Sequence, residues 1–146
     1  MSNNERNDLL YVCSLIEYIG RVTNNHRGYI VDWIGYDGLR HLYETASINH
    51  NLSFKQVSDE IIKDYGIQKG SFDTISNCSE KIPSYISIGG VYKRLIIELN
   101  NNDIIKTIYN VFNSFLSDEI SNFDSDLFYQ NVSYLCACYC AGKILD

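Results

Sequence analysis

The chain has 146 residues, of which 45% are hydrophobic and 13% aromatic, and its net charge is −6. This apolar content excludes intrinsic disorder, and the length fits one domain over residues 1–146 that begins with a polar, flexible stretch at 1–7. The acids gather toward the end, where seven acids and two bases from Glu98 onward give a balance of −5 that disfavours direct nucleic-acid binding.

Two helices are predicted in the first 35 residues, because apolar residues recur there at every third or fourth position. The first helix runs over 5–21. The second is short, capped by Asn25 and ended by Gly35, since a glycine just past a helix adopts the left-handed conformation without strain. The inward face of this second helix is expected to hold Tyr29, Ile30, Trp33 and Ile34.

Two further helices follow. Asp37 is placed to cap a third helix over 38–48, and the second and third helices together have the outline of a helix-turn-helix. The DNA-binding interpretation is disfavoured because no basic stripe accompanies this pair. A fourth helix begins after Ser53, which matches a capping box with Gln56, and ends near Gly66.

The middle of the chain changes character. Residues 68–87 are rich in Gly, Ser and Asn without a sustained period, so they are predicted to form an irregular connection with a one-turn helix near 72–75. A connection of this length is often functional or packed back on the surface. A buried helix over 88–99 follows, in which Gly89 and Gly90 let another helix approach closely.

Two helices are predicted in the last third. One runs over 104–116 behind a cap at Asn102 or Asp103, and a polar, aromatic-bearing turn region over 121–130 follows it. The other runs over 132–145, and its apolar residues are Leu135, Cys136, Tyr139, Cys140 and Ile144. The sequence therefore predicts an all-α protein, a single irregular (orthogonal) bundle of six to eight helices.

No motif of a known chemistry is present. Cys136 and Cys140 share a helix face while Cys138 points almost opposite, so the three thiols cannot close one tetrahedral site, and neither a metal nor a cofactor is predicted. The redox role of these thiols stays open. No apolar run is long enough to cross a bilayer and no signal peptide is visible, so the five cysteines favour a reducing cytoplasm.

Basic side chains at the break between the first two helices form the first candidate site. The guanidinium groups there and a helix N-terminus both favour oxyanions, so an enzyme or a phosphate- or nucleotide-binding domain is one hypothesis. Its candidate residues are Arg21, His26, Arg27 and His41. The competing interpretation pairs each Arg with a nearby acid such as Glu17, Asp32 or Asp37.

A stretch of acids interleaved with aromatic residues forms the second candidate site. Carboxylates steer the encounter with a basic partner, and aromatic side chains supply buried anchors. The residues are Phe115, Asp118, Glu119, Phe123, Asp124, Asp126, Phe128 and Tyr129. The alternative is a solvated loop whose aromatic side chains turn into the core.

Three segments carry a resemblance to a known family: LLYVCSLIEYIGR, VDWIGYDGLRHLYETA and CSEKIPSYISIGGVYKRL. Over about Leu9–Leu145 the chain is similar to a family of small, acidic, all-helical bacterial proteins of Firmicutes type. Members are often encoded beside a protein with an ADP-ribosyltransferase-like fold. The resemblance implies an antitoxin, immunity or accessory role. The leading hypothesis is an interaction module that restrains or assists a protein partner, with its oligomeric state open.

Overall fold

The chain is mostly helical in the computed structural model, which describes residues 1–146. The prediction of an all-α bundle of six to eight helices is confirmed, since eight α-helices and one 3-10 helix form and no strand does. The elements are α1 (Asn3–Thr23), α2 (Arg27–Glu44), α3 (Ala46–Asn49), α4 (Phe54–Tyr65), α5 (Tyr85–Leu99), α6 (Ile104–Phe112), α7 (Phe115–Ile120), η1 (Leu127–Tyr129) and α8 (Val132–Ala141).

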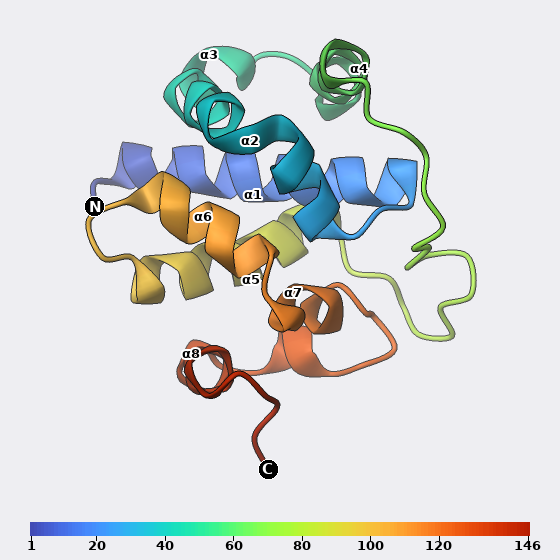
Figure 1. Ribbon diagram of the computed structural model, residues 1–146, viewed down its shortest axis with the longest axis vertical. Helices are drawn as coiled ribbons and strands as arrows, with labels where there is room; N and C mark the ends of the chain where they lie inside the picture. The colour runs from blue at the N-terminus through green and yellow to red at the C-terminus, as the bar shows by residue number, and fades with distance from the viewer.

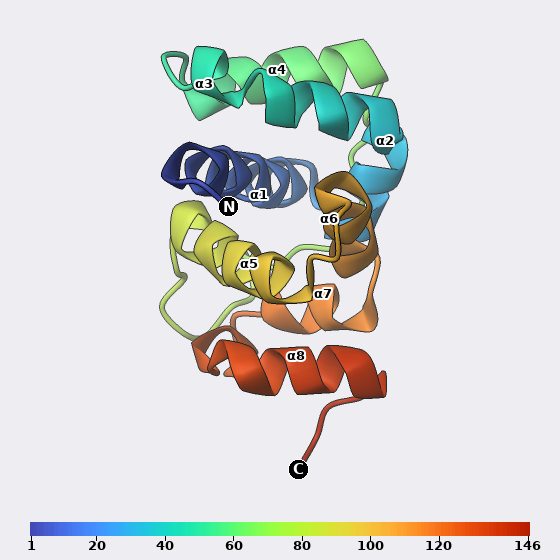
Figure 2. The ribbon, with the colours of Figure 1, turned by 90° about the vertical axis from the view of Figure 1, so that its left-hand side faces the viewer.

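The helices stack in layers on either side of α1. Figure 2 shows α3, α4 and part of α2 above α1, with α5 and α6 below it and α7 and α8 at the far end. In Figure 1, α1 runs across the view whereas α4 and α8 are seen nearly end-on, so the helices cross instead of lying parallel. None of these helices has both the length and the apolar composition that crossing a lipid bilayer requires.

α1 begins earlier than its apolar pattern predicts. The Ser2 side chain accepts a hydrogen bond from the N–H of Glu5, and the Glu5 carboxylate accepts one from the N–H of Ser2, so the two form a capping box. The helix therefore starts at Asn3, within the polar stretch 1–7. Its core side chains from Leu9 to Ile19 are fully buried.

α2 consists of the predicted second and third helices, which meet at a kink. Gly35 (φ 75°, ψ 174°) departs from the helical conformation at the predicted boundary, and the chain is helical on both sides of it. Asp37 already lies within the helical conformation, so it is not the cap of the third helix. His26, not Asn25, occupies the N-cap position and makes no side-chain capping bond.

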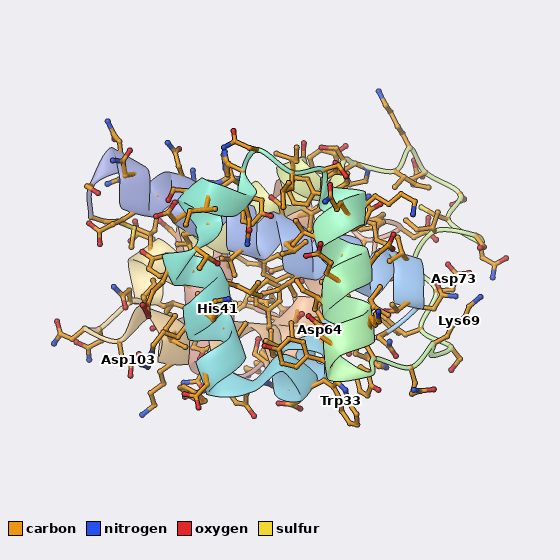
Figure 3. All side chains as sticks on the ribbon, turned by 90° about the horizontal axis from the view of Figure 1, so that it is seen from above. Trp33, His41, Asp64, Lys69, Asp73 and Asp103 are labelled. Carbon is orange, nitrogen blue, oxygen red and sulfur yellow. The ribbon has the colours of Figure 1, made fainter.

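The prediction that Trp33 faces inward is wrong, because its side chain is 48% exposed. At 100° per residue, Trp33 and Tyr29 lie at the edge of the buried stripe that Ile30 and Ile34 form. The two rings stack with centroids 5.6 Å apart, and the indole N–H donates to the carbonyl of Tyr65 at the end of α4. Trp33 therefore ties α2 to α4 at the surface, where Figure 3 shows it at the periphery.

Caps account for both ends of α4, although only the Ser53 half of the predicted capping box forms. The Ser53 hydroxyl accepts a 3.0 Å hydrogen bond from the N–H of Gln56, and Gly66 adopts the left-handed conformation (φ 63°) just past the helix. In the last third the prediction of one helix over 104–116 is wrong. The Asn113–Ser114 pair separates α6 from α7. Asp103 caps α6 by accepting from the N–H of Lys106.

α8 ends at Ala141, where Gly142 takes a left-handed conformation (φ 72°), and not at residue 145. Its buried side chains are Leu135 and Cys138, whereas Cys140 is exposed. The residues of α8 are apolar on every side of the helix, so its sequence did not indicate which side faces the core.

The crossing of α1 and α5 depends on one glycine. A Cβ atom added at Gly89 would lie 2.2 Å from Ser14 Oγ and 2.8 Å from Ser14 Cα. At Gly90 the nearest atom would be Arg94 Nη1 at 3.4 Å. The sequence predicts close approach for both glycines, but only Gly89 lies in the contact.

Replacing Gly89 by Ala is therefore expected to destabilise the protein by about 1–3 kcal/mol, because α1 and α5 must separate. The matched change Gly90→Ala is expected to be neutral or to stabilise by up to about 1 kcal/mol, because alanine favours helix. Urea unfolding of both variants measures the two free energies. Equal destabilisation would contradict the tight contact at Gly89.

Candidate functional site

A charged pair lies in the centre of the protein. Glu17 on α1 is 0% exposed and Arg27 at the start of α2 is 1% exposed. Arg27 donates from Nε to Glu17 Oε1 at 2.9 Å and from Nη2 to Glu17 Oε2 at 2.8 Å. This two-pronged geometry compensates both charges for the loss of water.

The pair extends into a hydrogen-bond network that joins four helices. Arg21 donates to Glu17 Oε2 at 2.7 Å, and Ser121 donates from Oγ to Glu17 Oε1 at 2.9 Å. The Tyr92 hydroxyl of α5 lies 2.7 Å from Ser121 Oγ and donates to the carbonyl of Ser117 in α7. Gly20 makes room for the network, because a Cβ atom there would lie 2.4 Å from Arg27 Cδ.

Protonation in the network follows from its charges. Burial alone would raise the pKa of Glu17, but the adjacent guanidinium groups of Arg27 and Arg21 outweigh it and hold that pKa below its ordinary value. Burial, together with the Glu17 charge, raises the pKa of the Tyr92 phenol. The carboxylate therefore stays ionised and the phenol stays neutral at pH 7.

The first candidate site does not form a cluster with a free anion-binding surface. Both guanidinium groups, of Arg21 and Arg27, bond to Glu17, which settles the alternative that the sequence left open between Glu17, Asp32 and Asp37. Arg27 is buried and cannot reach a dissolved ligand. His41 is exposed on α2, roughly four turns beyond Arg27, and Figure 3 shows it on the outer layer.

His26, the fourth of these residues, belongs to a different surface. Its ring stacks on Phe72 with centroids 3.9 Å apart, and its Nδ1 lies 2.9 Å from Asp118 Oδ1. His26 therefore joins the connection after α4 to the acidic helix α7.

The connection over 67–84 is packed back on the surface. This was one of the two alternatives that the sequence analysis gave for it, the other being a functional role. The N–H groups of Gly70 and Phe72 donate to the carbonyls of Thr23 and Asn24, both at 2.8 Å, and the Asn25 side chain donates to the carbonyl of Gln68. Figure 1 shows this connection descending from α4 to the level of α7. The predicted one-turn helix at 72–75 is absent, because Asp73 forms a turn by accepting from the N–H groups of Ile75 and Ser76.

The far end of this connection is bound to the second candidate site. Asp124 Oδ1 accepts hydrogen bonds from the N–H and the hydroxyl of Ser79, both at 3.0 Å, and from Cys78 Sγ at 3.5 Å. Bonds from Ser79 lower the pKa of Asp124, and bonds from Ser76 and Ile75 lower the pKa of Asp73 to about 2. Both carboxylates are therefore fixed in place and charged.

Two surface hollows bring acids from the connection and from the C-terminal third together. One hollow, of about 280 Å³, lies between Asp73 and α7, and the other, of about 460 Å³, lies between Glu80 and η1. Asp124 lines both. We call this surface the acidic face, and its residues are Asp73, Glu80, Asp118, Glu119, Asp124, Asp126, Phe128 and Tyr129.

The structure separates the predicted partner-binding residues into two groups. Phe123 is buried, and Arg21 lies over its ring at 4.7 Å, so this aromatic side chain turns inward as the alternative proposed. Phe115 is exposed but lines neither hollow. Six of the eight lie on the acidic face: Asp118, Glu119, Asp124, Asp126, Phe128 and Tyr129.

Sequence reasoning missed two members of this face, Asp73 and Glu80. They lie 35 or more residues before α7, and the anchored connection brings Asp73 beside α7 and Glu80 beside η1. Asp73 stands two residues before Ile75 in a Ser- and Asn-rich segment, which is the signal of an Asx turn but gives no indication of its distant neighbours.

The thiols and acids of the protein include no group of three or more His, Cys, Asp or Glu arranged to hold a metal ion. All five cysteines are free. The acidic face thus offers charge and aromatic surface.

Comparison of the chain with models of protein families, with curated proteins and with solved structures finds no match.

The variant Arg27→Met is expected to lose about 3–5 kcal/mol of stability, because it leaves the Glu17 charge buried with only Arg21 as a charged partner. Arg21→Met is expected to cost less, since Arg21 is partly exposed and the two-pronged Arg27 bond survives. Guanidinium unfolding at pH 7 measures both. A larger loss in Arg21→Met would contradict the assignment of Arg27 as the main partner.

The stability of the native protein is expected to depend on the ionisation of Glu17. The folded-state pKa of Glu17 is below the ordinary 4.5. The ionised carboxylate therefore contributes fully to the free energy of unfolding above about pH 4.5, and this contribution is lost as the pH falls through the folded-state pKa. The free-energy gap between the native protein and Glu17→Gln should therefore narrow as the pH falls below about 4.5. Unfolding curves at intervals from about pH 7 to 3 measure the gap, and a constant gap would contradict this pKa shift.

Proposed function

We propose that this protein is an interaction module whose acidic face binds a basic surface of a protein partner. The partner suggested by the sequence resemblance is a toxin-like enzyme, which the module restrains or assists in the cytoplasm.

The observation that carries the proposal is the position of Tyr129. Its side chain is 78% exposed and lies 4.2 Å, centroid to centroid, from the ring of Phe128, beside the larger hollow. Tyr129 is exposed and Phe128 is half-buried, so the pair presents one aromatic side chain to a partner on a partly buried aromatic support. Tyrosine is among the residues that dominate binding energies at interfaces.

Charge around this aromatic pair supports a basic partner. Asp124 and Asp126 line the same hollow, and Glu80 lies across it with one base, Lys81. Carboxylates accelerate the encounter with a positive surface and disfavour acidic competitors and nucleic acids. A guanidinium group that enters the hollow can pair with a carboxylate and stack on an aromatic face.

Preorganisation also supports the proposal. Asp124 is held by Ser79 and Cys78, and Asp118 is held by His26, so these carboxylates occupy fixed positions before a partner arrives. Fixed groups lose less conformational entropy on binding. The alternative of an anion-binding enzyme has weaker support, because both guanidinium groups on which it depends bond to Glu17.

A pull-down from native extract, with quantitative mass spectrometry, tests the proposal through matched variants. Tyr129→Ser and Asp126→Asn are expected to weaken capture of the specific partner, with Tyr129→Ser reducing affinity by more than about tenfold. Tyr36→Ser is the control, since Tyr36 is another exposed tyrosine, on α2, and lines neither hollow of the acidic face.

Capture is also expected to fall as salt rises, because exposed charges are screened. Two outcomes would contradict the proposal. One is that Tyr129→Ser captures the partner to the same extent as the native protein, and the other is that Tyr36→Ser loses as much capture as Tyr129→Ser does. The partner's activity, measured with and without the module, then shows whether binding restrains or assists it.

A further inference from the structure

A hollow of the opposite charge adjoins the acidic face. It has a volume of about 350 Å³ and lies between η1, the end of the connection that follows α4, and the first half of α5. Its charged residues are Lys81 and Arg94, and no acid lines it. We call it the basic hollow. In a chain with 18 acids and 12 bases, a hollow with two bases and no acid runs against the overall composition.

The two bases of the basic hollow are not neutralised within the protein, because all four of its ion pairs involve other residues. A Cβ atom added at Gly90 would lie 3.4 Å from Arg94 Nη1, so the guanidinium group turns back along α5 toward the start of the helix. The apolar lining residues are Pro83, Ile88, Val91 and Phe128. An apolar surface beside a cation strengthens its attraction to a carboxylate relative to open water.

The basic hollow and the larger hollow of the acidic face share a wall. Lys81, Phe128 and Tyr129 line both, so the two hollows adjoin at the aromatic pair. The larger hollow has three acids, Glu80, Asp124 and Asp126, and one base, whereas the basic hollow has two bases and no acid. The sign of the charge therefore reverses across Phe128 and Tyr129.

This reversal restricts the partner. A uniformly basic surface that enters the larger hollow would meet like charges at Arg94, and a uniformly acidic surface would meet them at Asp124 and Asp126. Only a segment that carries both signs pairs with both hollows. An extended chain turns every second side chain to the same side. A basic, an apolar and an acidic residue at alternate positions therefore match the order of charges on this surface.

We infer that the two hollows form one groove, which binds an extended, mixed-charge segment of the protein partner. An arginine of the segment occupies the larger hollow, an apolar side chain packs on Phe128 and Tyr129, and a carboxylate pairs with Arg94. The inference rests on the proposed function, to which it adds the carboxylate and the alternate spacing of the three side chains.

Titration of the isotopically labelled protein with blocked peptides, followed by NMR, tests the inference. The probes are the mixed-charge peptide Arg-Ser-Leu-Ser-Glu, its singly charged relatives Arg-Ser-Leu-Ser-Gln and Gln-Ser-Leu-Ser-Glu, and the same three sequences reversed, because the groove does not fix the chain direction. In one direction the mixed-charge peptide is expected to shift the amide signals of Val91, Arg94 and Tyr129 to saturation. It should bind about threefold more tightly than either singly charged relative, as one added surface ion pair predicts.

Two variants locate the carboxylate. Arg94→Gln is expected to weaken binding of the mixed-charge peptide by about threefold, and to leave binding of its arginine-only relative unchanged or tighter. Lys93→Gln is the matched control, because it removes the same charge from the neighbouring position of α5, and Lys93 lines neither hollow. It should bind every peptide as the native protein does.

The inference and the proposed function are read from different ends of the peptide. A preference for arginine over glutamine tests the larger hollow, and a preference for glutamate over glutamine tests the basic hollow. Three outcomes would overturn the inference while leaving the pull-down test of the acidic face intact. They are the absence of saturable shifts with either mixed-charge peptide, a mixed-charge peptide that binds no more tightly than its arginine-only relative, and equal losses in Arg94→Gln and Lys93→Gln.

Discussion

The buried pair of Glu17 and Arg27 is the constraint on which the arrangement of this protein depends. A carboxylate with no exposed surface costs several kcal/mol unless its lone pairs are occupied, and here Arg27, Arg21 and Ser121 occupy them. These donors come from α1, from the start of α2 and from the residue just after α7. Apolar packing brings the helices together, whereas this pair restricts how they are placed relative to one another.

The same pair organises the surface that we propose as the interaction face. Arg27 Nη2, which bonds to Glu17, also donates to Thr74 in the connection between α4 and α5, and its Nη1 donates to the carbonyl of Asn25. On the other side, Ser121 attaches the end of α7 to Glu17. The two halves of the acidic face, one before α5 and one after α6, are thereby positioned by one buried group.

Features determined by neighbouring residues in the chain could be predicted from the sequence, whereas features determined by residues far apart in the chain could not. The caps at Ser53 and Gly66 and the helical periods follow from neighbouring residues, so the all-α class and most helices were predictable. The exposure of Trp33 was not, because it lies at the edge of a helical stripe and its position depends on α4. Arg27 had several acids within reach, and only the packing of α1 against α2 selects Glu17. The pairing of Asp124 with Ser79 joins residues 45 positions apart, for which a single sequence carries no signal.

Native-state hydrogen exchange of Arg27→Lys tests the central claim most directly. This variant keeps the charge but loses the planar fork that bonds to Glu17, Asn25 and Thr74. If the buried pair holds the acidic face, exchange at the amides of Gly70, Phe72 and Ser79 should accelerate by about tenfold more than exchange within α8, which lies outside the network. Uniform acceleration over all of these amides, or none, would show that the pair contributes only to global stability and would contradict the account.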